Sequence, residues 1–194
     1  MLKPMRKLLT FTLSLAALPA LAALQAGANA PMFEAPAALA GNEIQYSLKS
    51  ELAKGPVVVY FYPSAYTQGC NIQAHTFSTN MEKFNAAGAT VVGVSLDSIA
   101  RLKDFSADPE YCAGKLPVAS DAGGAIAKSF ELMVAEGRAG FKDTRGNEID
   151  HGFAERTTFV VTPDGKIAAT IGGREVTPTD NVMKALAAVE ALKQ

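Results

Sequence analysis

Two short runs of apolar residues, rich in β-branched and aromatic side chains, constrain the fold of this chain more than any other feature. The first is Pro56–Tyr62 (PVVVYFY) and the second is Thr90–Leu96 (TVVGVSL). Neither run alternates apolar with polar residues, as a strand with one face in water would. A continuous run is typical of a strand buried on both faces, as in parallel or mixed sheets.

The segment between these runs has the spacing of an amphipathic helix. From Thr67 to Ala86 the residues that we expect to face a core are Ile72, Phe77, Met81 and Phe84. Gly88 follows as a helix stop. After the second run, Asp97-Ser98 supplies N-cap chemistry for another helix, which we expect to reach about Ser106.

Weaker signals complete the order of elements. We expect short strands at 44–48, 116–119, 156–161 and 166–171, and helices at 123–130 and 179–192. The last two strands are joined by Thr162-Pro163-Asp164-Gly165, in which Pro presets φ and Gly accepts a positive φ, as a tight turn requires. Residues 135–154 are polar and Gly-rich and are expected to form a loop. This order predicts an α/β domain with a central mixed sheet flanked by helices on both faces.

The amino-terminal residues have the pattern of an export signal. A basic start is followed by an apolar run that ends near Leu24 and by small residues at 26–30. Pro19 interrupts the run, which is shorter than the roughly 20 residues needed to cross a bilayer, so a removable signal is favoured over a membrane anchor. We therefore expect a signal at 1–28 and a folded domain at 31–194.

Cleavage of this signal is expected near residues 28–30. Ala26-Gly27-Ala28 is an A-x-A-like sequence and favours the bond after Ala28, whereas a cut after Ala30 would leave Pro31 at the disfavoured next position. Export would place the mature chain in the periplasm if the source is Gram-negative. No stable membrane association is expected once the signal is removed.

Cys70 is predicted to lie where a helix begins directly after a buried strand. Backbone N–H groups in the first helical turn lack partners, and the helix dipole favours negative charge there. Both effects stabilise a thiolate, the nucleophilic form of cysteine. Against this reactive role, two cysteines in an exported protein form a structural disulfide by default, and Cys70 and Cys112 are the only two in the sequence.

Around Cys70 the chain resembles the peroxiredoxin family. Residues Pro63–Cys70 (PSAYTQGC) match the family signature P-x3-T-x2-C and follow the expected apolar strand. Arg156–Val161 (RTTFVV), followed by Pro163-Asp164-Gly165, resembles the arginine-bearing strand and hairpin of the family. The similarity extends from about Phe33 to Leu192, and the bacterioferritin-comigratory (peroxiredoxin Q-like) branch is the most similar.

The resemblance implies a thioredoxin-like fold and a thiol-dependent peroxidase that uses no metal, haem or flavin. Cys70 would attack hydrogen peroxide or an organic hydroperoxide and become a sulfenic acid, with release of water or an alcohol. Arg156 would place a permanent positive charge beside the sulfur. Thr67 would offer a hydroxyl to sulfur and peroxide, and Pro63 would shield the thiolate from water.

The chain departs from many members of this branch at the second cysteine. Many relatives carry a resolving cysteine five residues after the first, where this chain has His75. The remaining candidate is Cys112, whose attack on the sulfenic acid would form an internal disulfide. Two cysteines join only when their Cα atoms lie within about 7 Å, so the helix around Cys70 would have to unwind locally. Alternatively, Cys112 is a buried small residue or a structural disulfide partner, or Cys70 works alone with an external thiol.

Other functions would require other residues. A non-catalytic thioredoxin-fold binding or scaffold protein would be expected to lose at least one of Cys70, Thr67 and Arg156. A disulfide oxidoreductase would carry C-x-x-C, which does not occur here. A Cys/His metal site is disfavoured because no C-x-x-C or H-x3-H pair anchors it. We expect His75 on a helix surface and His151 in a loop.

The expected partners follow from this chemistry. They are hydrogen peroxide, alkyl hydroperoxides and a thioredoxin-like or other dithiol reductant that can act in an oxidising compartment. The net charge of −1 provides no basic footprint for nucleic acid. A monomer is the expected state, with a dimer as the alternative.

Overall fold

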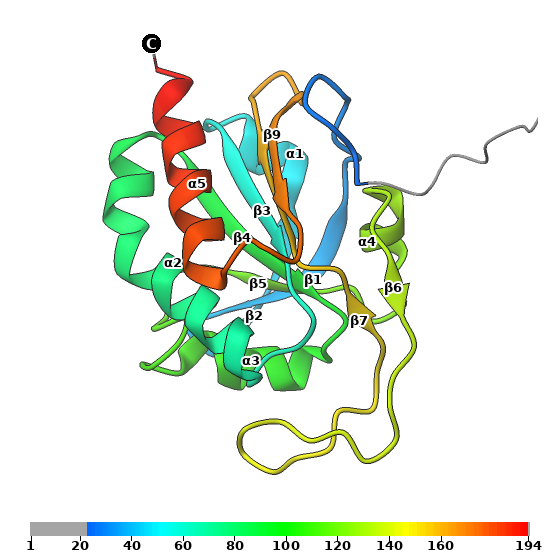
Figure 1. Cartoon of the computed structure of the whole chain (residues 1–194). Coiled ribbons are helices and arrows are strands. Elements are labelled where there is room, and N and C mark those ends of the chain that lie inside the picture. Colours follow the sequence, from blue (N-terminus) through cyan, green and yellow to red (C-terminus); the bar gives the residue numbers. More distant parts are fainter. Residues whose placement is uncertain (1–22, 194) are drawn as a thin grey trace, which may run out of the picture.

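Seven strands form the central sheet of the computed structural model, which describes residues 23–193 (Figure 1). Their order across the sheet is β2-β1-β5-β4-β3-β8-β9. The strands are β1 (Glu34–Leu39), β2 (Asn42–Ser47), β3 (Val57–Phe61), β4 (Thr90–Ser95), β5 (Val118–Ser120), β8 (Thr157–Val161) and β9 (Ile167–Gly172). The helices are α1 (Leu48–Leu52), α2 (Gln68–Ala86), α3 (Ile99–Ala107), α4 (Ala125–Ser129) and α5 (Pro178–Ala191).

The sheet is mixed, as the sequence predicted. The three strands β3, β4 and β5 are parallel, whereas β8 and β9 continue the sheet antiparallel on one side and β1 and β2 on the other. Every residue of β3 is buried, and β4 is buried after its first residue. The two uninterrupted apolar runs therefore form adjacent central strands.

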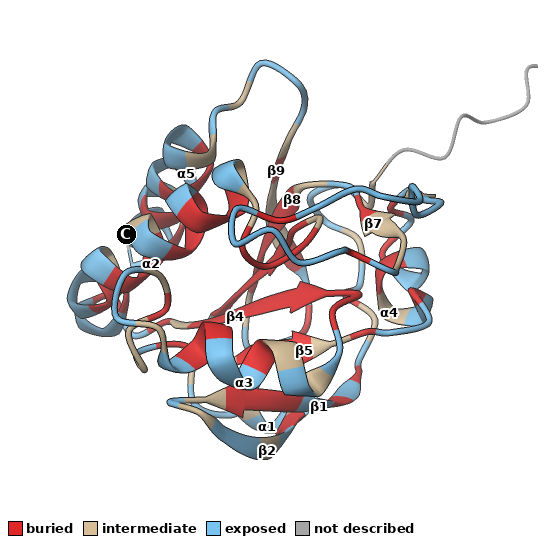
Figure 2. Cartoon of the chain, turned by 90° about the horizontal axis from the view of Figure 1, so that it is seen from below, coloured by how far each residue is buried: buried red, intermediate tan, exposed pale blue. Residues whose placement is uncertain are grey.

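Helices cover both faces of this sheet and create two apolar cores. Alternate residues of β3 enter different cores, because successive side chains of a strand point to opposite faces. Val58 and Tyr60 pack with α2, α3 and α5, whereas Val57, Val59 and Phe61 pack with α1 and α4. Figure 2 shows β4 buried beyond its first residue, with α2, α3 and α5 exposing their outer faces.

Strand β1 and helix α1 are the elements outside the predicted 135–154 loop that the sequence interpretation missed entirely. The strand has the sequence EAPAAL, and alanine and proline carry little strand signal. Pro36 is tolerated because it pairs only with β2, while the partners of β5 are Ala37 and Ala38. The strand expected at 44–48 begins two residues earlier, at Asn42, and ends at Ser47 as β2.

Residues 24–30, near the beginning of the described chain, lie beside the outer edge of β9. The Gly27 N–H donates to the Ile167 carbonyl at 2.8 Å, and the Ala28 carbonyl accepts from the Ile167 N–H at 2.9 Å. The Ala30 N–H donates to the Gly165 carbonyl at 2.9 Å. Leu24 and Ala28 also pack against the core on the α1 and α4 face. The residues 1–22 of the expected export signal lie outside the described part of the chain.

The predicted loop at 135–154 is largely irregular, with a two-stranded ribbon at its ends. This ribbon pairs β6 (Val134–Ala135) with β7 (Phe153–Ala154). Figure 1 shows the intervening chain as a long excursion from the body of the domain. Of the helices described between residues 23 and 193, none is long and apolar enough to cross a membrane.

Gly93, in β4, provides a test of core packing. It lies opposite Tyr60 of β3, and an added Cβ would lie 2.6 Å from the Tyr60 hydroxyl oxygen. Because protein cores are close-packed, we expect Gly93→Ala to lower the free energy of unfolding by about 1–3 kcal/mol. The control is Gly123→Ala, where nothing lies within 4 Å of the new Cβ. Urea unfolding followed by circular dichroism measures both, and equal stability of the two variants would contradict this packing.

Candidate active site

Cys70 occupies the first turn of α2, just after the turn that follows β3. Thr67 is the N-cap of this helix, with extended backbone angles, and Cys70 is its third residue. The cysteine side chain is buried, with 2% of its surface exposed. Cys70 therefore lies at the positive end of the helix dipole, in the turn whose first N–H groups have no partner within the helix.

Arg156, the residue before β8, lies directly beside this sulfur. Its Nη2 is 3.3 Å from Cys70 Sγ, and its Nη1 donates a hydrogen bond to Gln73 Oε1. Gly69 allows the approach, since a Cβ there would lie 3.1 Å from Arg156 Nη2. The guanidinium is therefore oriented toward the sulfur by the Gln73 acceptor on α2. The lack of a side chain at Gly69 leaves room for it.

A buried chain of polar side chains fixes Gln73 in turn. Gln73 Nε2 donates to Asn181 Oδ1 at 2.9 Å, and the Thr158 hydroxyl of β8 donates to the same oxygen. Asn181 Nδ2 donates to the Ile171 carbonyl at 3.0 Å. Both amide side chains are almost fully buried, so a broken bond would leave a polar group unpaired. The orientation of Arg156 therefore depends on α2, α5, β8 and β9 together.

Thr67 and Pro63 flank the same position. Thr67 Oγ1 donates to the Ser64 carbonyl at 2.9 Å, which leaves its oxygen able to accept a hydrogen bond from a peroxide O–H. Pro63 lines two neighbouring cavities, one bounded by Arg156 and the other by Thr67. The structure thus brings Arg156 into contact with Cys70 Sγ and places Pro63 and Thr67 in the turn and cap that lead to Cys70.

Cys112, the expected resolving cysteine, lies in the turns after α3. It is fully buried in the apolar cluster that also contains Cys70, and both cysteines are free. Burial, with a further contribution from Asp108, raises the pKa of the Cys112 thiol well above its usual range. His75 Nδ1 donates to the Glu110 carbonyl at 2.8 Å and so ties this segment to α2. In this state Cys112 is a protonated, shielded thiol.

The groups that hold the turn before Cys70 are the part of the site that the sequence interpretation missed. Asp97 accepts hydrogen bonds from the Ala65 N–H and the Ser64 hydroxyl, each at 2.8 Å. The helix-capping role expected of Asp97-Ser98 belongs to Ser98 alone. His151, expected only as a loop residue, contacts Asp97. These residues are far apart in sequence, and no local pattern relates them.

The two histidines lie in different parts of the molecule. His75 is on the exposed face of α2, and His151 lies between the 136–150 segment and Asp97. Within residues 23–193, no three side chains of His, Cys, Asp or Glu are grouped so that they could hold a metal ion.

Residues 26–170 match the model of the AhpC/TSA family. The chain belongs to this family. A putative peroxiredoxin of Mycobacterium tuberculosis is 36% identical over 144 residues, which cover 74% of this chain and 82% of the relative. The crystal structure of peroxidoxin BcpB from the same species has a TM-score of 0.73 at 29% identity and covers 88% of this chain and 99% of that one.

A second solved structure is similar along most of its length. It is the bacterioferritin comigratory protein of Xanthomonas campestris, reported with its alkyl peroxide reduction activity; the TM-score is 0.63 at 28% identity, over 82% of this chain and 92% of that one. These likenesses confirm the thioredoxin-like fold and the bacterioferritin-comigratory branch expected from the sequence. The protein is a peroxiredoxin, a thiol-dependent peroxidase.

Gln73 provides a test of how this peroxiredoxin orients its arginine. Gln73→Met keeps the side-chain volume but removes the acceptor for Arg156, so we expect peroxide-driven oxidation of Cys70 to slow on the order of tenfold to a hundredfold. Gln68→Met is the matched control, because Gln68 lies on the same helix with an exposed side chain. Stopped-flow measurement of the second-order rate with hydrogen peroxide compares them. Equal rates in the two variants would show that the buried amide does not position Arg156.

Proposed function

We propose that this peroxiredoxin reduces hydrogen peroxide and organic hydroperoxides through a sulfenic acid on Cys70. The observation that carries the proposal is the 3.3 Å contact of Arg156 Nη2 with Cys70 Sγ at the start of α2. The thiolate attacks one peroxide oxygen, the O–O bond breaks, and the departing oxygen takes up a proton to become water or an alcohol. Arg156 stabilises the negative charge as it moves from sulfur to the departing oxygen.

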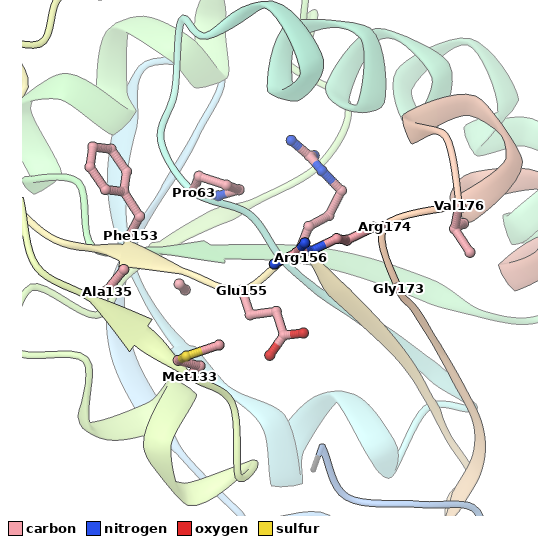
Figure 3. Close-up of a pocket in the computed structure, with 10 residues that line it drawn as sticks. Pro63, Met133, Ala135, Phe153, Glu155, Arg156, Gly173, Arg174 and Val176 are labelled. Carbon is pink, nitrogen blue, oxygen red and sulfur yellow. The ribbon is translucent and has the colours of Figure 1, made fainter. Parts of the chain in front are cut away.

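Apolar cavities beside this site support organic hydroperoxides as substrates. The larger has a volume of about 400 Å³ and the smaller about 330 Å³, and both are lined by Pro63, Ala135 and Phe153. Figure 3 shows the larger cavity, with Pro63, Phe153 and Met133 on one side and Arg156 and Val176 on the other. An alkyl group attached to the peroxide would therefore contact Pro63, Ala135 and Phe153 in these cavities.

We propose that Cys112 then resolves the sulfenic acid. Its thiol gives up a proton, its sulfur bonds to the Cys70 sulfur, and the sulfenic oxygen leaves as water. A thioredoxin-like or other dithiol would reduce the disulfide and become oxidised itself. The presence of both cysteines in one apolar cluster supports this step.

Cysteine variants test this mechanism. We expect Cys70→Ser to abolish hydrogen peroxide consumption with dithiothreitol as reductant, because no nucleophile remains. We expect wild type to lose two hydrogens when it is treated with peroxide, as an internal disulfide requires, and Cys112→Ser to stop at a sulfenic acid. Intact-protein mass spectrometry separates these products. If Cys70 stays unoxidised in every form, the peroxidase mechanism is overturned. If wild type consumes peroxide without forming a disulfide, only the resolving role of Cys112 is overturned.

We also propose that the chain is exported, to the periplasm if the source is Gram-negative. The basic and apolar start of the sequence supports this. The packing of residues 24–30 bears on the cleavage point, because a cut after Ala28 would remove part of the segment that covers β9. Ala20-Leu21-Ala22 is a second A-x-A sequence and follows the helix-breaking Pro19, so we favour cleavage after Ala22.

The amino terminus of the exported protein tests this choice. The full-length chain is expressed in a Gram-negative host, recovered from the periplasm and sequenced from its amino terminus. We expect Ala23 to be the first residue, since this retains all the contacts with β9. Asn29 as the first residue would support the cleavage after Ala28 instead. An intact Met1 in the cytosolic fraction would overturn export in that host.

A further inference from the structure

The turn before Cys70 is anchored to a buried carboxylate at the end of β4. Asp97 is fully buried. Its Oδ2 accepts hydrogen bonds from the Ala65 N–H at 2.8 Å and the Ser95 hydroxyl at 2.7 Å, and its Oδ1 accepts from the Ser64 hydroxyl at 2.8 Å. The backbone that leads to Cys70 is therefore fixed at Ala65 by a charge-assisted bond.

His151 approaches the same carboxylate from the 136–152 segment and carries a positive charge there. Its Nε2 lies 2.9 Å from Asp97 Oδ1, and its Nδ1 lies 2.7 Å from the Gly152 carbonyl. A carbonyl oxygen and an ionised carboxylate can each only accept a hydrogen bond. Both ring nitrogens of His151 must therefore donate, as they do only in the protonated, positively charged ring. Burial would raise the pKa of Asp97, but the hydrogen bonds from His151 and Ala65 outweigh it and hold that pKa below its usual range.

A second set of bonds fastens the same segment across the turn. Arg101 Nη2 donates to the Ala65 carbonyl and to Asp143 Oδ2, both at 2.8 Å, and Arg101 Nε lies 2.9 Å from Asp97. The Thr144 N–H donates to the Tyr66 carbonyl at 2.9 Å. The turn is therefore held from α3 and from the 136–152 segment at once.

The backbone of the turn is in an unfavourable conformation at Tyr66. Its φ is +59°, in the left-handed region that bulky residues rarely adopt. Such a conformation persists only where the surrounding contacts over-determine it. Release of the contacts would allow the turn to relax and the first turn of α2 to open.

Ser64, His151 and Asp97 do not form a hydrolytic triad, although their residue types suggest one. The Ser64 hydroxyl donates to Asp97 at 2.8 Å, and its oxygen is 3.5 Å from His151 Nε2. Both side chains point at the carboxylate, so the histidine is not placed to deprotonate the serine. The cluster holds a turn rather than activating a nucleophile.

We propose that His151 is a positioning residue whose charged pair with Asp97 holds the 63–67 turn closed and so sets how readily Cys70 leaves α2 to meet Cys112. This inference rests on the proposed function for its link to Cys112. The closed turn keeps Cys70 beside Arg156 for attack on peroxide. The open turn lets the two sulfurs approach.

The strength of this hold depends on pH. Burial would lower the pKa of His151, but the hydrogen bond and charge of Asp97 outweigh it and raise that pKa above its usual value of 6.5. A group with a raised pKa stabilises the closed state fully below its ordinary pKa and loses this contribution as the pH rises through the raised value. The turn is therefore held more tightly at pH 6 than at pH 9.

Other charged groups lie near the imidazole. Arg101 from α3 and Glu148 and Asp150 from its own segment line a polar cavity of about 360 Å³ together with His151. Arg101 opposes protonation of His151. Asp97 is the group that bonds the ring directly.

Amide hydrogen exchange without peroxide tests the hold on the turn by itself. His151→Gln keeps a donor that can reach Asp97 but has no charge at any pH, and Asp150→Asn changes an exposed neighbouring charge as the matched control. At pH 6 we expect amides in residues 64–71 to lose protection on the order of tenfold in His151→Gln relative to wild type, a typical size of coupling between contacting residues. At pH 9 the ratio should approach one, and the control should match wild type at both.

Single-turnover kinetics test the link to Cys112. After one equivalent of hydrogen peroxide, disulfide formation in His151→Gln should exceed wild type about tenfold at pH 6 and match it at pH 9, without faster sulfenic acid formation. Equal protection and equal rates at pH 6 would overturn the proposal, and so would the same ratio at both pH values, which indicates a merely structural role. If His151→Gln loses amide protection at pH 6 as expected but no disulfide forms in any variant, His151 still stabilises the closed turn. The resolving role of Cys112 would then be overturned.

Discussion

The contact between Arg156 and Cys70 depends on the pairing of β3 with β8. In this antiparallel register Phe61 lies opposite Thr157, so the residue before β8 meets the turn that leaves β3. A slip by one residue would send every side chain of β8 to the other face and turn Thr158 away from Asn181. The position of the Arg156 charge beside the sulfur thus results from strand pairing in the centre of the sheet. The buried amides of Gln73 and Asn181 link the guanidinium to Thr158 of β8 by hydrogen bonds, so its orientation depends on this register.

The sequence predicted what is encoded locally. The central strands were recognisable because they are buried on both faces, and the residues around Cys70 because they fall within short motifs. Strand β1 was missed because its alanines and Pro36 carry little strand signal, and it forms through its pairing with β2 and β5. Gln73, Asn181 and His151 were missed for a different reason. Their partners lie far along the chain, and only the folded structure brings such groups together.

Under the proposed mechanism, the first turn of α2 has to meet two opposing demands. Attack on peroxide requires Cys70 to stay beside Arg156, at the positive end of the helix dipole. The proposed disulfide with Cys112 would form from thiols that are both free in this structure, and the helix around Cys70 would have to unwind locally for the two sulfurs to bond. A strained turn held by several polar contacts can satisfy both, since it is rigid while all the contacts are made and relaxes once they are lost.

Residues 24–30 cover part of the exposed edge of β9, the last strand of the sheet. An unpaired edge strand offers a row of N–H and C=O groups to any other chain with an exposed strand, and this is a common route to aggregation. Here the chain's own amino-terminal segment pairs with Ile167 at the start of β9, and the Thr170 hydroxyl donates to the Leu24 carbonyl. At the opposite border β2 carries exposed Asn42, Glu43 and Gln45, which discourage such pairing. The two borders therefore discourage strand pairing by different means, backbone pairing at the start of β9 and exposed polar side chains along β2.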